Sequence, residues 1–297
     1  LVTGASSGIG EAFAEVFAAE GFDLVITARR EERLAAVADM LRREHGNQVD
    51  VIVADLSVQD APAKLCDEIA RRGLVVDVLV NNAGYGVPGT FAASPWTRQA
   101  ALLQVMVVAL AELTHRLLPG MVDRGYGRII NVASLAAFVP APAGHTLYAA
   151  CKAFVVKFSE SLSNEVTRSG VHVTALCPGF TRSEFHDVTG TRAAVGELPS
   201  WLWKDAAQVA REGFDAVMAG TPIHVTGRVN RTIATRARYV PSRVLVAVGR
   251  RAARRYRETG VGPVAREGSE RHCTWGVHLW HRHALLCLLP ATSLITQ

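Results

Sequence analysis

The chain has 297 residues, of which 49% are hydrophobic and 20% charged, so one domain, or one domain with an appendage, can bury a substantial core. We find neither a signal peptide nor an uninterrupted apolar run of roughly 20 residues, the length that a membrane-spanning helix needs, and we expect a cytoplasmic protein. The five cysteines are odd in number and contain no CxxC pair, which argues against disulfides and against a zinc knuckle. The formal charge is +5, but the arginines are concentrated in the C-terminal third, so the charge does not indicate nucleic-acid binding.

Short β-branched runs alternate along the chain with longer segments of helical period. Strands that are apolar throughout and separated by helices are typical of a parallel sheet covered on both faces. The sequence therefore predicts an α/β fold, a doubly wound parallel sheet with helices on both faces, whose strands include residues 23–28, 49–54, 76–81, 128–133 and 171–177. Leu1 and Val2 stand directly before a glycine-rich turn, so we expect the first strand to be truncated.

The stretch VTGASSGIGEAF leaves a strand at Val2 and enters a helix by about Ile9, with glycines at 4, 8 and 10. Glycine allows the positive φ angles of a tight turn and lets a pyrophosphate approach the backbone, while the helix N-terminus offers N–H donors and a partial positive charge. Glycines also serve ordinary loops, so the motif alone is weak evidence for a nucleotide site. Its place between a strand and a helix strengthens it.

Further motifs follow in order along the chain: NNAG at 81–84, Ser134, Tyr148-x-x-x-Lys152, and PGFTRSEF from 178. Together with TGASSGIG at 3–10 they resemble the short-chain dehydrogenase/reductase family, in its single-domain branch. The resemblance runs from residue 1 to roughly 230. It implies a Rossmann fold with a substrate lid at about 180–220, and an oxidoreductase that interconverts a carbonyl and an alcohol with a nicotinamide cofactor.

The second predicted strand ends where a dinucleotide fold meets the adenosine ribose. An acidic residue there binds the 2′-hydroxyl of NAD(H), whereas an arginine accommodates the 2′-phosphate of NADP(H). Ala28 stands in the place of the acid and is followed by Arg29 and Arg30, which favours NADP(H), although two arginines also suit the solvated start of a helix. Including what the resemblance implies, the residues expected to contact the cofactor are Gly4, Ser6, Ser7, Gly8, Ile9, Gly10, Arg29, Arg30, Asp55, Asn82, Ala83, Gly84, Tyr148, Lys152, Pro178, Gly179 and Thr181.

Reduction of a carbonyl needs a proton for the developing alkoxide as well as a hydride. Residues four apart share a helix face, so Lys152 can lie beside Tyr148 and lower the pKa of its phenol. Ser134 follows an apolar strand at the edge where open parallel sheets bind ligands, and its hydroxyl would polarise the substrate oxygen. We expect these three as catalytic residues, although each alone suits a turn, core or surface position, and Asp55 could equally cap a helix that begins near Ser57.

One departure from the family's pattern concerns Met106, in LLQVMVVALAELTH, where members usually carry an asparagine. The backbone of that asparagine normally holds a water that links the lysine to solvent. The relay survives the substitution if the carbonyl group of residue 106 still bends outward, and is weakened if the asparagine side chain is needed to stabilise the helix kink. Met106 and the short first strand motivate an alternative, a non-catalytic NADP(H)-binding sensor or scaffold on the same fold.

Aromatic and apolar side chains near the predicted lid suggest an apolar carbonyl or alcohol substrate, unless the tryptophans only pack the lid; they are Phe138, Val139, Pro142, Phe180, Phe185, Trp201 and Trp203. Residues 231–258 predict a basic amphipathic helix, which could lie weakly on an anionic membrane surface, or be solvated, or pair within an oligomer. Residues 259–297 predict a tail of uncertain order whose histidines match no metal site. The family favours a homodimer or homotetramer through the helices around 100–120 and 148–168.

Overall fold

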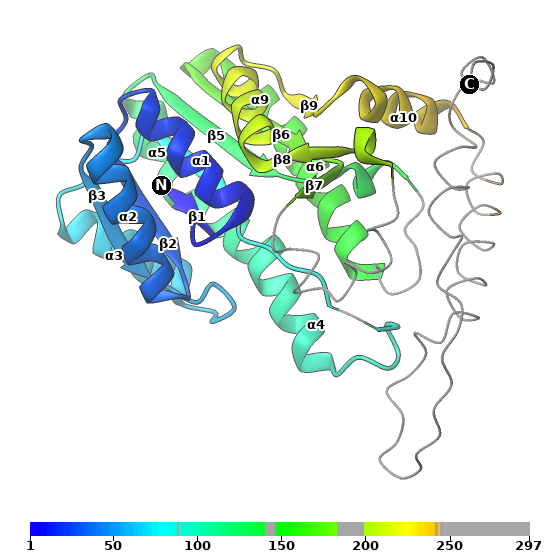
Figure 1. Cartoon of the computed structure of the whole chain (residues 1–297), viewed down its shortest axis with the longest axis horizontal. Helices are drawn as coiled ribbons and strands as arrows, with labels where there is room; N and C mark the ends of the chain where they lie inside the picture. Colours follow the sequence, from blue (N-terminus) through cyan, green and yellow to red (C-terminus); the bar gives the residue numbers. More distant parts are fainter. Residues whose placement is uncertain (88, 140–145, 183–198, 241–242, 244–246, 248–297) are drawn as a thin grey trace, which may run out of the picture.

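The structure, a computed structural model, describes residues 1–87, 89–139, 146–182, 199–240, 243 and 247 (Figure 1). Its centre is a seven-stranded parallel sheet in the order β3-β2-β1-β4-β5-β6-β9. The strands are β1 (Val2–Thr3), β2 (Leu24–Ala28), β3 (Val49–Val53), β4 (Val78–Asn81), β5 (Gly127–Val132), β6 (Val171–Cys177) and β9 (Ile223–Val225). The strand order reverses between β1 and β4, and sheets of this kind bind ligands beyond the carboxyl ends of the strands at such a point.

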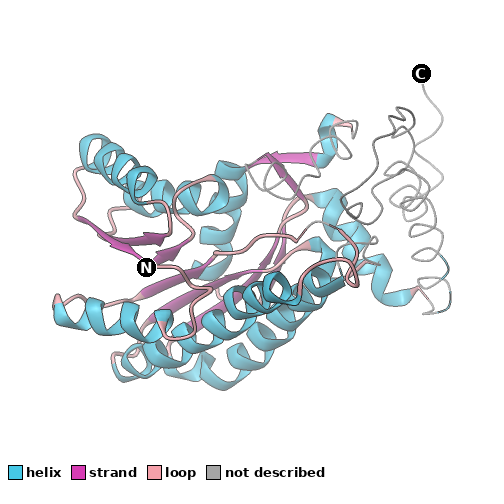
Figure 2. Ribbon diagram, turned by 90° about the horizontal axis from the view of Figure 1, so that it is seen from below, coloured by secondary structure: helices cyan, strands magenta, loops and turns pink. Residues whose placement is uncertain are grey.

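Successive side chains of a strand face opposite sides of the sheet, and here both sides are apolar. The first side is formed by Ile26, Val80 and Ile130, and the second by Val25, Leu79 and Ile129. The first side is covered by α1 (Gly8–Ala19), α2 (Glu31–His45) and α9 (Ala206–Met218), and the second by α3 (Ala61–Arg71), α5 (Leu110–Asp123) and α6 (Thr146–Val166). Figure 2 shows these helices on both faces, and the predicted doubly wound sheet is confirmed.

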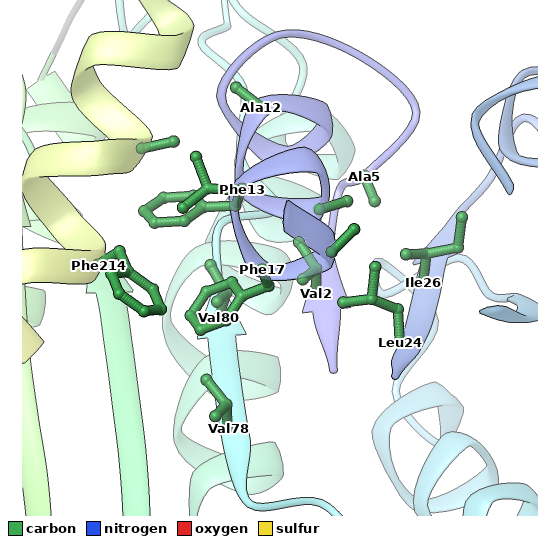
Figure 3. Packing of buried hydrophobic residues seen from close by; sticks show 14 of the residues in the cluster. Val2, Ala5, Ala12, Phe13, Phe17, Leu24, Ile26, Val78, Val80 and Phe214 are labelled. Atoms are coloured by element: carbon green, nitrogen blue, oxygen red, sulfur yellow. The ribbon is translucent and has the colours of Figure 1, made fainter. Parts of the chain in front are cut away.

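Aromatic rings join α1 and α9 over the first side of the sheet (Figure 3). Phe17 and Phe214 lie with ring centres 5.1 Å apart, and Phe13 is fully buried beside them. Burying one such ring contributes roughly 1.5–3 kcal/mol. Residues 206–218, within the segment expected to be a substrate lid, therefore form a helix of the core, while residues 183–198 of that segment lie outside the described residues.

The longest helical segment on the second side runs through α4 (Trp96–Leu103), η1 (Gln104–Ala109) and α5. By length and composition alone this segment could cross a membrane. It was not predicted to do so, because charged and polar residues interrupt its apolar stretches. Its residues Met106, Leu113 and Met121 are at most 1% exposed and belong to the core on that side of the sheet. This packing is that of a core helix in a globular domain.

Two smaller features complete the described chain. Strands β7 (Phe180–Arg182) and β8 (Trp203–Asp205) form a separate parallel pair. Helix α10 (Arg228–Tyr239) buries Ile233, Ala234 and Ala237 in the core and exposes Arg228 and Arg231. The basic helix predicted over 231–258 thus begins at Arg228, and its apolar side packs against the domain; most of its remainder and the whole predicted tail lie outside the described residues.

Candidate active site

The glycine-rich turn joins β1 to α1. Gly4 and Gly8 have φ angles of 67° and 62°, which other residues adopt only with strain. At Gly10 the reason for glycine is closeness, because a Cβ atom would lie 2.2 Å from the Gly4 carbonyl oxygen and 2.5 Å from Asn82 Nδ2. The turn is therefore tight enough to set the N-terminus of α1 at the carboxyl end of β1, the arrangement in which a pyrophosphate binds.

Asn82 and Thr3 hold this turn in place. The Asn82 Nδ2 group donates to the Thr3 carbonyl oxygen at 2.9 Å, and Thr3 Oγ1 accepts from the backbone N–H groups of Asn82 and Ala83 at 2.9 and 3.0 Å. The Asn82 side chain is thus engaged within the protein, and it serves a nucleotide site by positioning the turn. Thr3 was not among the predicted residues, because a threonine at the end of a strand carries no distinguishing signal.

Arg30 reaches from the start of α2 back to the glycine-rich turn. Its Nη2 atom donates to Ser7 Oγ at 2.7 Å and to Ser6 Oγ at 3.1 Å, and its Nε atom donates to Ser6 Oγ at 3.2 Å. These contacts fix an exposed guanidinium beside two hydroxyls near the N-terminus of α1, where the helix dipole favours an anion. Ala28, at the end of β2, adds no carboxylate to oppose it.

Arg29 interacts electrostatically with Asp55 and Tyr85. Burial acts to raise the pKa of the Asp55 carboxyl, but hydrogen bonds from Ser57 N and Oγ, at 3.0 and 2.8 Å, and the charge of Arg29 outweigh burial and hold that pKa below its usual value. The interpretation of Asp55 as a helix cap near Ser57 is wrong, since α3 begins at Ala61. Asp55 closes a local turn instead.

Ser134 and Tyr148 meet beyond the carboxyl end of β5. Ser134 precedes the short helix η2 (Leu135–Ala137), and its Oγ accepts from Ala136 N at 3.1 Å. The Ser134 hydroxyl lies close enough to the Tyr148 phenol to act on its pKa. Burial raises the pKa of Tyr148 to about 12, although the Ser134 hydroxyl acts to lower it. The phenol therefore keeps its proton at neutral pH.

Lys152 lies one turn further along α6. Its Nζ atom is 5.7 Å from the centre of the Tyr148 ring and donates to the Val132 carbonyl oxygen at 2.6 Å. The residue is 6% exposed, and burial lowers the pKa of its ammonium group to about 8. The net shift of the Tyr148 pKa is opposite to the lowering expected from the sequence, because desolvation of the phenol dominates.

Gly84 lies against both Lys152 and Met106. A Cβ atom on Gly84 would be 3.6 Å from Met106 Cγ and 3.7 Å from Lys152 Nζ. Met106 lies within η1, whose backbone hydrogen bonds are of the π type. Such turns change the partners of the backbone carbonyls and are frequent at functional sites. The main chain is therefore irregular at the position where the sequence predicts a proton relay.

The turn after β6 packs against α10. Pro178 O accepts from Leu135 N at 2.8 Å, and Thr181 Oγ1 donates to Gly179 O at 3.3 Å. A Cβ atom on Gly179 would lie 2.4 Å from Asn230 Nδ2, so only glycine fits beside that side chain. Asn230 is buried and was not predicted, because nothing in its basic, polar neighbourhood distinguishes it in the sequence.

Phe180 and Trp203 pack beside this turn with ring centres 5.7 Å apart. Phe138 and Val139 are partly buried against a hydrophobic cluster that includes Val155 and Val156 of α6. Outside the described residues or side chains lie Pro142, Phe185 and Trp201. Within the part of the chain that the structure describes, no group of three or more His, Cys, Asp or Glu side chains could hold a metal ion. The C-terminal histidines lie outside that part.

Comparison with known proteins agrees with this geometry. Residues 1–193 match the family model described as short chain dehydrogenase. The chain is 34% identical over 237 residues to the sulfoacetaldehyde reductase 2 of Chromohalobacter salexigens, an alignment that covers 78% of this chain and 91% of that protein.

Two solved structures are similar. The short-chain dehydrogenase from Sphingobium yanoikuyae, in complex with NADPH, superposes with a TM-score of 0.70 at 28% identity over 91% of this chain and 97% of that one. The bulky-bulky ketone specific alcohol dehydrogenase from Comamonas testosteroni has a TM-score of 0.68 at 29% identity over 80% and 90% of the two chains. Because the family model covers more than half of the chain, the protein belongs to the short-chain dehydrogenase/reductase family and is an oxidoreductase that acts on C=O or CH–OH groups.

Proposed function

We propose that this enzyme uses NADP(H) to interconvert a carbonyl and an alcohol on an apolar small molecule, with Tyr148 as general acid and base. The observation that carries the proposal is the close approach of the Ser134 hydroxyl to the Tyr148 phenol beyond the carboxyl end of β5. Bound NADPH supplies the hydride. The pKa of about 12 leaves Tyr148 protonated at neutral pH, as donation to a carbonyl oxygen requires.

Ser134 and Lys152 prepare that proton transfer. Because Ser134 Oγ accepts from Ala136 N, its own proton is left to donate, and it can polarise the substrate oxygen together with Tyr148. Once Tyr148 has lost its proton, the buried ammonium of Lys152 stabilises the phenolate through space. By resemblance to the family, Lys152 also holds the ribose of the nicotinamide half.

The glycine-rich turn fits the nucleotide, because a side chain at Gly10 would collide with Gly4 and Asn82. The preference for NADP(H) rests on Arg30, whose guanidinium is fixed beside Ser6 and Ser7. An arginine fork matches a phosphate with two parallel hydrogen bonds. The NADPH complex of the Sphingobium relative gives further support.

An apolar substrate is supported by the packed pair of Phe180 and Trp203 beside the Gly179 turn, and by the bulky ketones named for the Comamonas relative. We also infer a homodimer or homotetramer through α5 and α6. Val108 and Phe154 expose 44% and 39% of their surface in that region. A membrane contact through α10 would be weak and electrostatic, because the apolar side of that helix is buried in the core.

Binding of NADPH and NADH, followed by NADPH oxidation with a panel of apolar aldehydes and ketones, tests the proposal. We expect tighter binding of NADPH, and a loss of kcat/KM by roughly 100- to 10,000-fold in Tyr148→Phe with unchanged NADPH affinity. Tyr126→Phe is the matched control, since Tyr126 precedes β5 at the opposite end of that strand. Binding of NADPH without turnover that depends on Tyr148 would favour the sensor or scaffold alternative, and tighter binding of NADH would contradict the role of Arg30.

A further inference from the structure

A cleft between α4 and the start of α6 opens beside Tyr148. It is partly open to solvent, its volume is about 10 Å³, and it is lined by Val87, Phe91, Gln99, Leu102, Thr146, Leu147 and Tyr148. A space of roughly 10–15 Å³ holds about one water-sized group. Because Tyr148 forms part of its wall, the described cleft accommodates one small polar group of the substrate close to the reacting group.

Among the described residues that line the cleft, Gln99 is the one with a side-chain amide. It is only 6% exposed, and it shares the inner face of α4 with Leu102, three residues further along. Within the described chain, no hydrogen-bond donor or acceptor pairs with its carboxamide. The carboxamide atoms are not sealed from solvent, so they can bind water in the cleft. A ligand that displaces this water has to replace its hydrogen bonds, or a cost of about 1–3 kcal/mol follows. A buried amide that faces a cleft and lacks a partner is therefore ready to bind a ligand group.

The chemistry of the wall restricts that group. Among the described residues that line the cleft, none is charged, and the other polar groups are the hydroxyls of Thr146 and Tyr148. A carboxylate, sulfonate or ammonium group would lose its hydration there without a counter-charge, which is costly. A carboxamide both donates and accepts, so it suits a neutral carbonyl, ester, amide or hydroxyl.

We propose that Gln99 determines substrate specificity by hydrogen-bonding a second, neutral oxygen or nitrogen of the substrate while Tyr148 acts on the carbonyl. The inference rests on the proposed reductase function and narrows its substrate class. The preferred substrate is then a ketone or aldehyde with an apolar skeleton and one further hydrogen-bonding group. Plain apolar ketones are poorer substrates, because they leave the Gln99 amide buried without a partner.

Methyl oxoheptanoates in which the ketone moves from the third to the sixth carbon, compared with octanones, test this proposal. Gln99→Met replaces the amide by an apolar group of similar shape. Gln104→Met is the matched control, because Gln104 is a glutamine on the same helical segment that is not among the described residues lining the cleft. The ratio of kcat/KM between keto ester and octanone is measured in the wild type and in both variants, together with the melting temperature.

We expect at least one keto ester to be preferred in the wild type, and Gln99→Met to lower its kcat/KM about tenfold while the octanones change little. Gln104→Met should leave the ratio unchanged. The melting temperature of Gln99→Met should stay about the same, because the amide has no hydrogen bond within the described chain to lose. An unchanged ratio for every keto ester, or a marked fall in melting temperature that indicates a structural role for Gln99, would overturn the proposal.

A binding measurement separates this proposal from the proposed function. In a Tyr148→Phe background, keto esters should raise the melting temperature of the NADPH complex, and the added Gln99→Met substitution should remove that rise. If neither octanones nor keto esters are reduced by the wild type but this protection is seen, the reductase function fails while the role of Gln99 stands. If turnover is normal and no protection depends on Gln99, only the role of Gln99 fails.

Discussion

At the scale of single residues, Lys152 combines a positive charge with deep burial. Its ammonium donates to Val132 O, and no carboxylate forms a salt bridge with it among the described residues. Burial lowers its pKa from 10.5 to about 8. Burial of this charge therefore lowers the free energy of unfolding at neutral pH. Charged groups that are buried at such a cost are frequent at functional sites.

Lys152→Met should stabilise the protein at pH 7 by about 1–3 kcal/mol while abolishing most turnover. Below pH 8 the folded and unfolded states both hold the lysine proton, and the folded state carries the full cost of burying it. Between pH 8 and 10.5 the unfolded state holds more protons, so the wild type gains stability as the pH rises.

Chemical unfolding of the wild type and Lys152→Met at several pH values checks this sign. The advantage of the variant should shrink steadily from pH 8 to 10. An advantage that does not change with pH, or a variant less stable than the wild type at pH 7, would show that the ammonium is not held at a cost.

At the scale of elements, the helical segment α4–η1–α5 has to cover the sheet and also present an irregular backbone near Lys152. The π-helical stretch Gln104–Ala109 falls where the family usually carries asparagine, and here it contains Met106, which is 1% exposed. The side chain at this position therefore belongs to the apolar core. If the relay depends on the main chain, the irregular helix is the feature that matters, and the residue type is secondary.

Met106→Asn should therefore lower the unfolding free energy by about 2–4 kcal/mol without raising kcat, because a polar amide replaces a core side chain. Met121→Asn, on the same helix and fully buried, is the matched control and should be similarly destabilised. Thermal unfolding and steady-state kinetics of both variants check this. A higher kcat in Met106→Asn would mean that the asparagine side chain itself supports the relay.

At the scale of the whole molecule, apolar side chains are exposed on the outer faces of η1 and α6, two of the helices that cover the second side of the sheet. Phe154 and Phe158 stack on α6 with ring centres 5.7 Å apart, and Val108 is exposed on η1. Both elements carry the proposed active site on their inner faces. Pairing of two copies through this region would bury its apolar side chains and hold α5 and α6 rigid.

Phe154→Glu should convert the proposed oligomer into a smaller species, because a two-fold interface would bring two carboxylates together in an apolar setting. Light scattering coupled to size-exclusion chromatography measures the change. Val75→Glu is the control, since Val75 is 65% exposed and lies in the turn between α3 and β4, outside α5 and α6. An unchanged mass for Phe154→Glu, or an equal effect of Val75→Glu, would place the interface elsewhere.

Much of the fold follows from local patterns in the sequence. The five predicted strands are present within a residue or two, because a parallel strand buried on both faces must be apolar throughout. Gly4 and Gly8 adopt the positive φ angles that the glycine-rich motif predicts. The spacing of Tyr148 and Lys152 placed both on one face of α6, since helix periodicity depends only on the chain itself.

What depends on segments far apart in the chain was decided by the tertiary structure alone. The sequence could not show that Arg30 would bind Ser6 and Ser7, or that Asn230 would force glycine at position 179. It also gave the wrong sign for the pKa of Tyr148, because desolvation depends on everything that surrounds a group, and neighbours in the sequence supply only part of those surroundings. The sequence by itself determined the family and the sheet, and it predicts the reacting side chains. The burial and pKa of those groups, and the position of Gln99 in the cleft, arise only when distant segments pack and exclude water.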